Sequence, residues 1–92
     1  MDTEQNAILI APEDNVATVI NEAAPGGTVR YFRSGEAVEL TSGGVPKYHK
    51  IALCDILKGE KIIKYGEVIG AATKDIPKGA HVHNHNILSG VQ

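Results

Sequence analysis

Histidine is the residue type that most clearly indicates chemistry in this 92-residue sequence, because three of its four histidines alternate near the C-terminal end. They are His81, His83 and His85, within the segment Gly79–Asn86. In an extended segment successive side chains point to opposite faces, so these three imidazoles would share one face. Alternate residues of a strand lie about 6.5–7 Å apart, and two imidazoles can converge from that spacing on one metal ion or anionic ligand. The segment is therefore predicted to carry the function.

The histidine segment does not contain a complete metal site by itself. A His-x-His pair offers two nitrogen ligands to zinc, iron or manganese, whereas a mononuclear site usually needs three protein ligands. His81 supplies the third ligand only if the strand bends, and His49 only if the fold brings it near. Solvated surface histidines, or histidines with a structural or interface role, are the alternatives that the sequence leaves open.

Two lysine–tyrosine segments offer further polar groups. In Lys47–Lys50 a histidine lies between two cations, an arrangement that suits a general base or a carboxylate-binding pocket. In Lys64–Glu67 adjacent ammonium and phenol groups could bind a substrate carboxylate or hydroxyls. Both segments also have an ordinary interpretation as a solvated loop or turn, so neither identifies a reaction.

The composition, 42% hydrophobic and 22% charged, is typical of one soluble globular domain. A net charge of -2, with both signs interspersed, argues against a nucleic-acid-binding surface. No apolar stretch approaches the roughly 20 residues that span a bilayer, and the polar N-terminal residues are unlike a signal peptide. These features predict a cytoplasmic protein without nucleic-acid or membrane partners.

The single cysteine, Cys54, excludes an internal disulfide and a metal site made of cysteines alone. Because it ends the apolar run Ile51–Cys54, it is predicted to be a small buried side chain rather than a nucleophile.

The elements that must position these residues are mostly short strands. The pattern predicts strands over residues 7–10, 28–33 and 37–41, with a turn at Ser34-Gly35-Glu36. Between the first two strands, apolar residues at helical spacing followed by Gly26-Gly27 predict a short helix over residues 14–23. The second half predicts strands over residues 51–54, 61–65, 68–73 and the histidine segment, with turns every six to ten residues.

An internal repeat relates two of the predicted turns. Asp-Ile-x-Lys-Gly occurs at residues 55–59 and again at residues 75–79. A shared Lys-Gly pair predicts the same turn geometry twice, with glycine supplying a positive φ.

The ordered series of short motifs resembles the SAF domain of altronate and galactarate dehydratases, and also the separate alpha subunit of (2R)-sulfolactate sulfo-lyase. The resemblance spans residues 7–88 and is densest between His49 and Asn86. The motifs are His49-Lys50-Ile51-Ala52-Leu53, Asp55-Ile56, Lys58-Gly59-Glu60, Ile63-Lys64-Tyr65-Gly66, Ile69-Gly70, Ala72-Thr73, Asp75-Ile76, Lys78-Gly79 and His83-Asn84-His85-Asn86.

This resemblance implies a mainly β fold of the SAF or β-clip type, which we expect to include the one short helix. We expect a single domain over residues 1–92, with residues 1–6 disordered and residues 87–92 forming a tail or the start of a linker.

The resemblance also implies a function. We expect the small subunit or N-terminal domain of a metal-dependent hydro-lyase that dehydrates a sugar acid such as altronate or galactarate. A large dehydratase or lyase subunit, or a C-terminal domain, would be its partner and would share a divalent metal such as iron. The alternatives are the alpha subunit of a sulfolactate sulfo-lyase, a non-catalytic sugar-acid-binding module, and a subunit that only stabilises its partner.

Site residues follow from matching the family motifs position by position. The resemblance implies metal ligation by His83 and His85, catalysis by His49 and His85, and substrate binding by Lys50, Lys64, Tyr65 and Asn86. Two positions depart from the family pattern. Cys54 lies where the family is often basic, and His81 lies where an aromatic residue is frequent, so His81 is expected to be a packing residue rather than a ligand.

Overall fold

The structure, a computed structural model, describes residues 5–89. All regular elements in this range are β-strands, and none of its residues forms a helix that could span a membrane. The prediction of a mainly β fold is confirmed. The strands are β1 (Ala7–Ile8), β2 (Val16–Val19), β3 (Thr28–Arg33), β4 (Glu36–Thr41), β5 (Lys50–Ala52), β6 (Lys61–Lys64), β7 (Glu67–Ala72), β8 (His81–Val82) and β9 (Ile87–Ser89).

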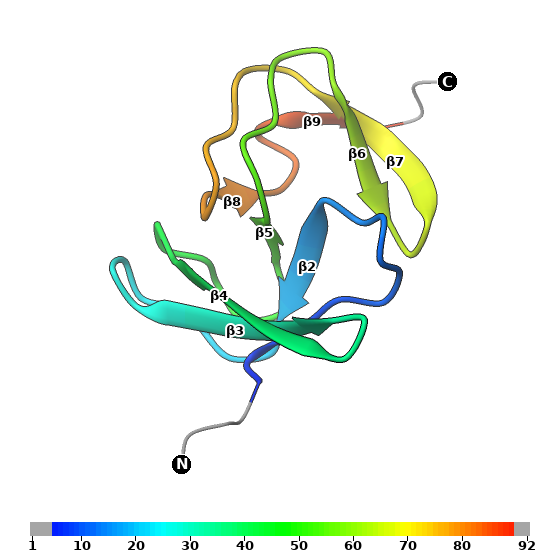
Figure 1. Ribbon diagram of the computed structural model, residues 1–92. Helices are drawn as coiled ribbons and strands as arrows, with labels where there is room; N and C mark the ends of the chain where they lie inside the picture. The colour runs from blue at the N-terminus through cyan, green and yellow to red at the C-terminus, as the bar shows by residue number, and fades with distance from the viewer. Residues whose placement is uncertain (1–4, 90–92) are drawn as a thin grey trace.

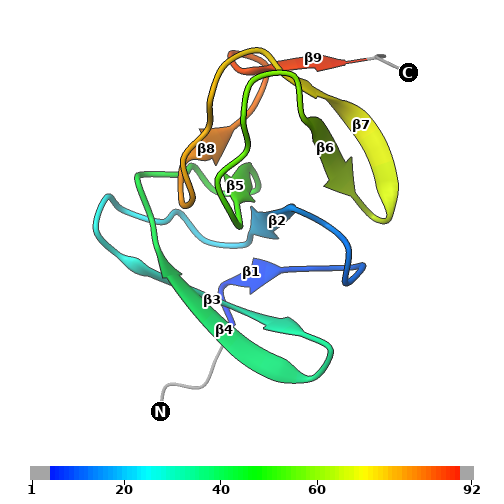
Figure 2. The same ribbon diagram turned by 45° about the horizontal axis from the view of Figure 1, so that its top comes forward.

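The strands form three antiparallel sheets arranged as layers (Figures 1 and 2). A four-stranded sheet in the order β1-β2-β5-β8 lies in the middle. The β3–β4 hairpin lies on one side of it, and the β6-β7-β9 sheet lies on the other. The central sheet therefore has both of its faces available for packing.

Two small hydrophobic cores enclose the central sheet. Successive residues of a strand point to opposite faces, so β2 and β5 contribute to both cores. One core, which includes Val19 and Ile51, packs against the β3–β4 hairpin, and the other, which includes Val16 and Ala52, packs against β6 and β7. Strands buried on both faces are held firmly in register, which gives the residues at their ends defined positions.

The predicted helix over residues 14–23 is wrong, because this segment contains strand β2. A strand buried on both faces carries apolar residues at successive positions, and such a run also matches helical spacing. Asp14, expected near the helix N-terminus, instead accepts hydrogen bonds from the backbone nitrogens of Tyr65 and Gly66 at 2.9 and 2.8 Å. Its buried carboxylate thereby joins the β6–β7 hairpin to the start of β2.

Both hairpins close through two-residue turns with left-handed backbone. Ser34 and Gly35 have φ values of 51° and 85°, and Tyr65 and Gly66 have values of 59° and 75°. Two successive positive φ values match the twist of paired strands, so such turns are favoured in hairpins. The predicted turn between residues 33 and 37 is confirmed.

The internal repeat predicts repeated turn geometry, and the structure confirms it. Gly59 and Gly79 have φ values of 90° and 89°. The two turns also bind each other, because Asp55 Oδ1 accepts a hydrogen bond from the nitrogen of Lys78 at 2.8 Å, and Asp75 Oδ1 accepts one from Lys58 at 2.8 Å. The repeat therefore forms a reciprocal pair of turns, one between β5 and β6 and the other between β7 and β8.

The predicted terminal segments are shorter than expected. Residues 87–89 do not belong to a tail: they form β9 and pair with β7 from Gly70 to Ala72. Near the other end, the Asn6 side chain accepts a hydrogen bond from the nitrogen of Arg30 at 2.7 Å and donates one to Thr28 O at 3.1 Å. Long-range pairing, which sequence periodicity does not report, orders both segments. Residues 1–4 and 90–92 of the predicted disordered and tail segments lie outside the described residues.

Cys54 is exposed, so the prediction of a buried cysteine is wrong. The run Ile51–Cys54 is not one strand, because β5 ends at Ala52 and the chain then turns away from the sheet. Partial burial and the nearby carboxylates of Glu60 and Asp55 raise the pKa of the Cys54 thiol. A thiol that keeps its proton is a poor nucleophile, which agrees with the expectation that Cys54 has no nucleophilic role.

Candidate functional site

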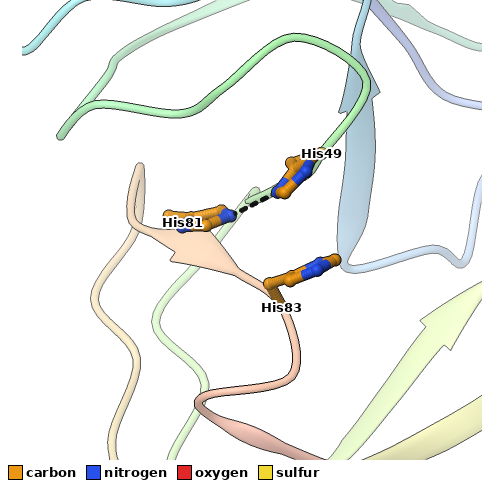
Figure 3. A group of neighbouring side chains, drawn as sticks. All are labelled: His49, His81 and His83. Carbon is orange, nitrogen blue, oxygen red and sulfur yellow. Dashed lines mark hydrogen bonds between the residues drawn. The ribbon is translucent and has the colours of Figure 1, made fainter.

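The pairing of β5 with β8 brings three histidines together (Figure 3). In this antiparallel ladder Ile51 lies opposite His81 and Lys50 lies opposite Val82. Continuing the register by one step places His83 opposite His49. Opposed residues of an antiparallel pair lie on the same face, so His49, His81 and His83 converge although 32 residues separate His49 from His81 in the sequence.

We call His49, His81 and His83 the histidine triad. One ring nitrogen from each residue lies within 4.8 Å of the others. His49 Nδ1 and His81 Nε2 are hydrogen-bonded at 2.8 Å, and the His49 and His83 rings stack with centroids 4.1 Å apart. The fold therefore brings His49 near the histidine segment, which was one of the two ways to complete a set of three ligands.

The histidine segment is only partly extended, so the prediction of one strand through Asn86 is wrong. Strand β8 contains His81 and Val82, and residues 83–86 form a turn closed by a hydrogen bond from Asn86 N to His83 O at 3.0 Å. His85 lies in this turn and outside the set of three nitrogens, although its ring centroid is 4.9 Å from that of His81 at a tilt of 41°. His81, expected to be a packing residue, lies inside the triad.

Asn86 holds the turn that carries His83. Its side chain is 4% exposed; Oδ1 accepts a hydrogen bond from His83 N at 2.9 Å, and Nδ2 donates one to His81 O at 2.9 Å. These bonds satisfy a buried amide and fix the backbone on both sides of Val82. Asn86 therefore positions two histidines of the triad. The sequence predicted only a role in substrate binding for this residue.

The surroundings favour the neutral imidazole at two triad positions. Burial lowers the pKa of His81 most, with further lowering by His85, His49, His83 and Lys50. Burial also lowers the pKa of His83 most, followed by His49, Lys50 and His85. Both effects penalise the imidazolium, because it would be desolvated and would lie beside other cations. A neutral imidazole can accept a proton or bind a metal.

The two predicted substrate-binding lysines interact electrostatically, and Lys50 also acts on the triad. Burial and the neighbouring ammonium of Lys64 lower the pKa of Lys50. Lys50 in turn disfavours the charged forms of His81 and His83. Lys64 Nζ lies 4.5 Å from the ring centroid of Tyr65, which is exposed. Lys50, Lys64 and Tyr65 therefore remain predicted contacts for an acidic substrate, and Lys50 adds positive charge near the triad.

The triad fits a divalent transition metal in the chemistry of its donors. Imidazole nitrogen is a common ligand of iron and zinc. His83 Nδ1 is buried without a hydrogen-bond partner among the described residues, so a ligand there would satisfy it. The stacked rings of His49 and His83 are only 23° from parallel, so their lone pairs do not converge. One ring would have to turn before both nitrogens could bind one ion.

An open groove of about 480 Å³ lies beside the triad. Its lining includes His81, His85 and Asn86, together with Lys74, which no sequence pattern identified. Lys74 lies in the connection after β7 within Thr73-Lys74-Asp75, where a lone lysine gives no signal above solvated surface. The groove therefore combines one triad histidine, the fourth histidine and a cation.

Comparison with known proteins identifies the family. The altronate/galactarate dehydratase SAF domain family matches residues 5–90. The chain is 45% identical over 73 residues to altronate dehydratase of Escherichia coli, covering 79% of this chain and 14% of the relative. It is 37% identical over 81 residues to galactarate dehydratase (L-threo-forming) of the same organism, covering 88% of this chain and 15% of the relative.

A third relative is a small subunit. Over 43 residues the chain is 42% identical to the (2R)-sulfolactate sulfo-lyase subunit alpha of Chromohalobacter salexigens, covering 47% of this chain and 46% of the relative. The chain spans only 14–15% of the length of the two Escherichia coli dehydratases, so the activities in their names belong to much longer proteins. The family match nevertheless covers nearly all of this chain. The chain therefore belongs to the altronate/galactarate dehydratase SAF domain family.

Proposed function

We propose that this chain is the histidine-bearing small part of a hydro-lyase that dehydrates a sugar acid such as altronate or galactarate. The observation that carries the proposal is the histidine triad, in which imidazoles from His49, His81 and His83 meet in a domain of this dehydratase family. A cluster of imidazoles with a lysine nearby suits proton transfer to and from an acidic substrate.

The triad would hold a divalent metal such as iron, with the remaining ligands coming from a larger domain or subunit. When bound, the metal would polarise the substrate carboxylate and hydroxyl and so acidify the proton next to the carboxylate. Support for this assignment comes from the all-nitrogen donor set and from His83 Nδ1, which is buried and has no hydrogen-bond partner among the described residues.

The remaining predicted residues divide between proton transfer and binding. Dehydration of a hydroxy acid needs a base for the proton next to the carboxylate and an acid for the departing hydroxyl. His85 lines the groove beside His81, so we assign it to one of these transfers, and His49 is the other candidate. Lys50, Lys64 and Tyr65 would bind the carboxylate end, and Asn86 would contact substrate from the wall of the groove.

The size of the relatives and the openness of the site support a larger partner. Residues matching this chain make up 14–15% of the two Escherichia coli dehydratases. The groove lies on the surface, whereas a site for dehydration must exclude bulk water. We therefore propose that a large dehydratase domain or subunit covers the groove, and that this chain is inactive without it.

Reconstitution tests the proposal. The chain is mixed with the large dehydratase part and ferrous iron, and dehydration of altronate and galactarate is measured. Loss of a proton-transfer or metal-binding histidine should lower kcat by roughly 100-fold, so His83→Ala and His85→Ala should each show this loss. Glu36→Ala, at the exposed start of β4 and outside both the triad and the groove lining, is the control. Full activity of a His83→Ala, His85→Ala double variant would exclude the site.

The alpha subunit of a (2R)-sulfolactate sulfo-lyase is the second candidate. The alignment covers 46% of that subunit, compared with 14% of the Escherichia coli altronate dehydratase. Release of sulfite from (2R)-sulfolactate, with the large lyase subunit replacing the dehydratase part, distinguishes the two reactions.

Calorimetry of the chain without a partner distinguishes a non-catalytic binding module from the dehydratase and sulfo-lyase candidates. A module whose function is binding should bind aldonic acids tightly alone, whereas one part of a divided active site should bind them weakly.

A further inference from the structure

Four turns among the described residues share one geometry, and one of them lacks glycine at its left-handed position. Each turn begins at an isolated β-bridge residue and is closed by a hydrogen bond from its fifth residue to the carbonyl of its second. In each, the fourth residue has a positive φ, as the third position of a type II turn requires. The turns are Ala23–Gly27, Val45–His49, Ile56–Glu60 and Ile76–Ala80.

Glycine occupies the left-handed position in three of the turns, and Tyr48 occupies it in the fourth. The φ values of Gly26, Gly59 and Gly79 are 83°, 90° and 89°, and that of Tyr48 is 69°. An L-residue with a side chain is strained in this region because its Cβ approaches the backbone, whereas glycine is not. Tyr48 therefore costs stability that glycine at the same position would not.

Backbone hydrogen bonds prevent Tyr48 from relaxing. Its nitrogen donates to Val19 O at 2.8 Å, and the following carbonyl, His49 O, accepts from Val19 N at 3.0 Å. A change of φ at Tyr48 would break the connection to β2, which is a central strand. The strain is thus imposed by the fold.

The side chain of Tyr48 does not offset the strain by burial. It is 67% exposed, among the most exposed large side chains of the described residues. The Lys47 ammonium lies 4.9 Å from the centroid of the Tyr48 ring, and such cation–π contacts are weak at exposed sites. An exposed aromatic ring on a strained, immobile backbone is a feature of ligand contacts.

The exception coincides with the histidine triad. The residue after Tyr48 is His49, whereas Gly27, Glu60 and Ala80 follow the glycines of the other three turns. The strained position therefore lies next to the triad in the chain. Of the other three turns, which have glycine at this position and no strain, Ile76–Ala80 also directly precedes a triad residue, His81.

We propose that Tyr48 is a specificity-determining contact for the sugar acid. Its ring would pack against the carbon chain, its hydroxyl would hydrogen-bond a substrate hydroxyl, and the Lys47 ammonium held over the ring would pair with a carboxylate. This assignment rests on the proposed function, because it takes a polyhydroxy carboxylate as the ligand of the triad. A second cationic contact at Lys47 would suit an acid with carboxylates at both ends, such as galactarate.

The test separates stability from binding in the 92-residue chain. The melting temperature is measured, and galactarate and altronate are titrated in the presence of Zn²⁺ while amide NMR shifts are followed, a method that detects weak binding. Tyr48→Gly should raise Tm by several degrees, and it should weaken galactarate binding about tenfold. Tyr48→Ala should weaken binding equally without raising Tm, because alanine keeps the strain.

Ser34→Gly is the matched control, because it relieves a positive φ in the β3–β4 hairpin. It should raise Tm and leave binding unchanged. If Tyr48→Gly binds both acids as the wild-type chain does, or lowers Tm, the inference on Tyr48 is wrong while the proposed function stands. If the wild-type chain shifts no amide with either acid, the proposed ligand class is wrong, and the inference fails with it.

Discussion

Asn86 and His83 hydrogen-bond each other twice: His83 N donates to Asn86 Oδ1 at 2.9 Å, and Asn86 N donates to His83 O at 3.0 Å. This reciprocal pair closes the turn after β8 and fixes where the His83 ring leaves the backbone. The geometry of the triad therefore depends on a residue that is not itself a member of it.

Replacement of Asn86 should destabilise the domain, and Asn84 provides a control in the same turn. Asn86→Ala leaves the partly buried His83 N–H and His81 carbonyl without these partners, which should lower the free energy of unfolding by roughly 1–3 kcal/mol. Asn84 is exposed, so Asn84→Ala should change it by less than about 0.5 kcal/mol. Urea unfolding measures both, and equal effects of the two variants would contradict the positioning role.

Added metal should stabilise the chain through the triad. Zn²⁺ at a free concentration of about 100 times its Kd should raise the free energy of unfolding by about 2.7 kcal/mol, and excess chelator should reverse the gain. His49→Ala and His83→Ala should abolish most of this gain, whereas His85→Ala should keep it because His85 lies outside the triad. If His85→Ala is as damaging as His83→Ala, the metal pair inferred from the sequence motif is the better assignment.

Stability without metal should depend on pH through His81 and His83. Their folded-state pKa values lie below the ordinary value of 6.5, so the unfolded chain binds more protons as the pH falls below 6.5. The contribution of these groups is therefore complete above pH 6.5 and is lost as the pH falls through their folded pKa values. Urea unfolding at pH 7.5, 6.5 and 5.5 in chelator measures the slope. A His81→Gln, His83→Gln double variant with an unchanged slope would contradict this origin.

Asp14 should be the most costly carboxylate to remove among those in turns. Its buried side chain accepts hydrogen bonds from the nitrogens of Ala11, Tyr65 and Gly66. Asp14→Ala should lower the free energy of unfolding by at least about 2 kcal/mol and speed hydrogen exchange at the Tyr65 and Gly66 amides. Asp55→Ala, which removes one hydrogen bond from an exposed turn, should cost about 0.5–1.5 kcal/mol. Slow exchange at Gly66 in Asp14→Ala would show that the hairpin does not depend on this anchor.

Local patterns predicted the hairpins and the repeated turns. The Ser34-Gly35 turn and the two Asp-Ile-x-Lys-Gly turns occur where the sequence indicates, because a positive φ is a property of a few adjacent residues. The same local reasoning failed over residues 14–23. Both faces of β2 are buried by the two other layers of the fold. The residues of those layers lie elsewhere in the sequence, so the pattern around β2 could not indicate them.

For the candidate site, too, the sequence predicted some features and the tertiary structure decided the others. Alternation by itself placed His81, His83 and His85 on one face, and the sequence already offered His49 as a possible third ligand. Only the tertiary structure decided that the His49 ring stacks on His83, that His81 belongs to the triad, and that His85 lies in a turn outside it. Side-chain direction along a strand is a local property of the backbone, whereas the pairing of β5 with β8 joins residues about 30 positions apart, and its register depends on the packing of both cores.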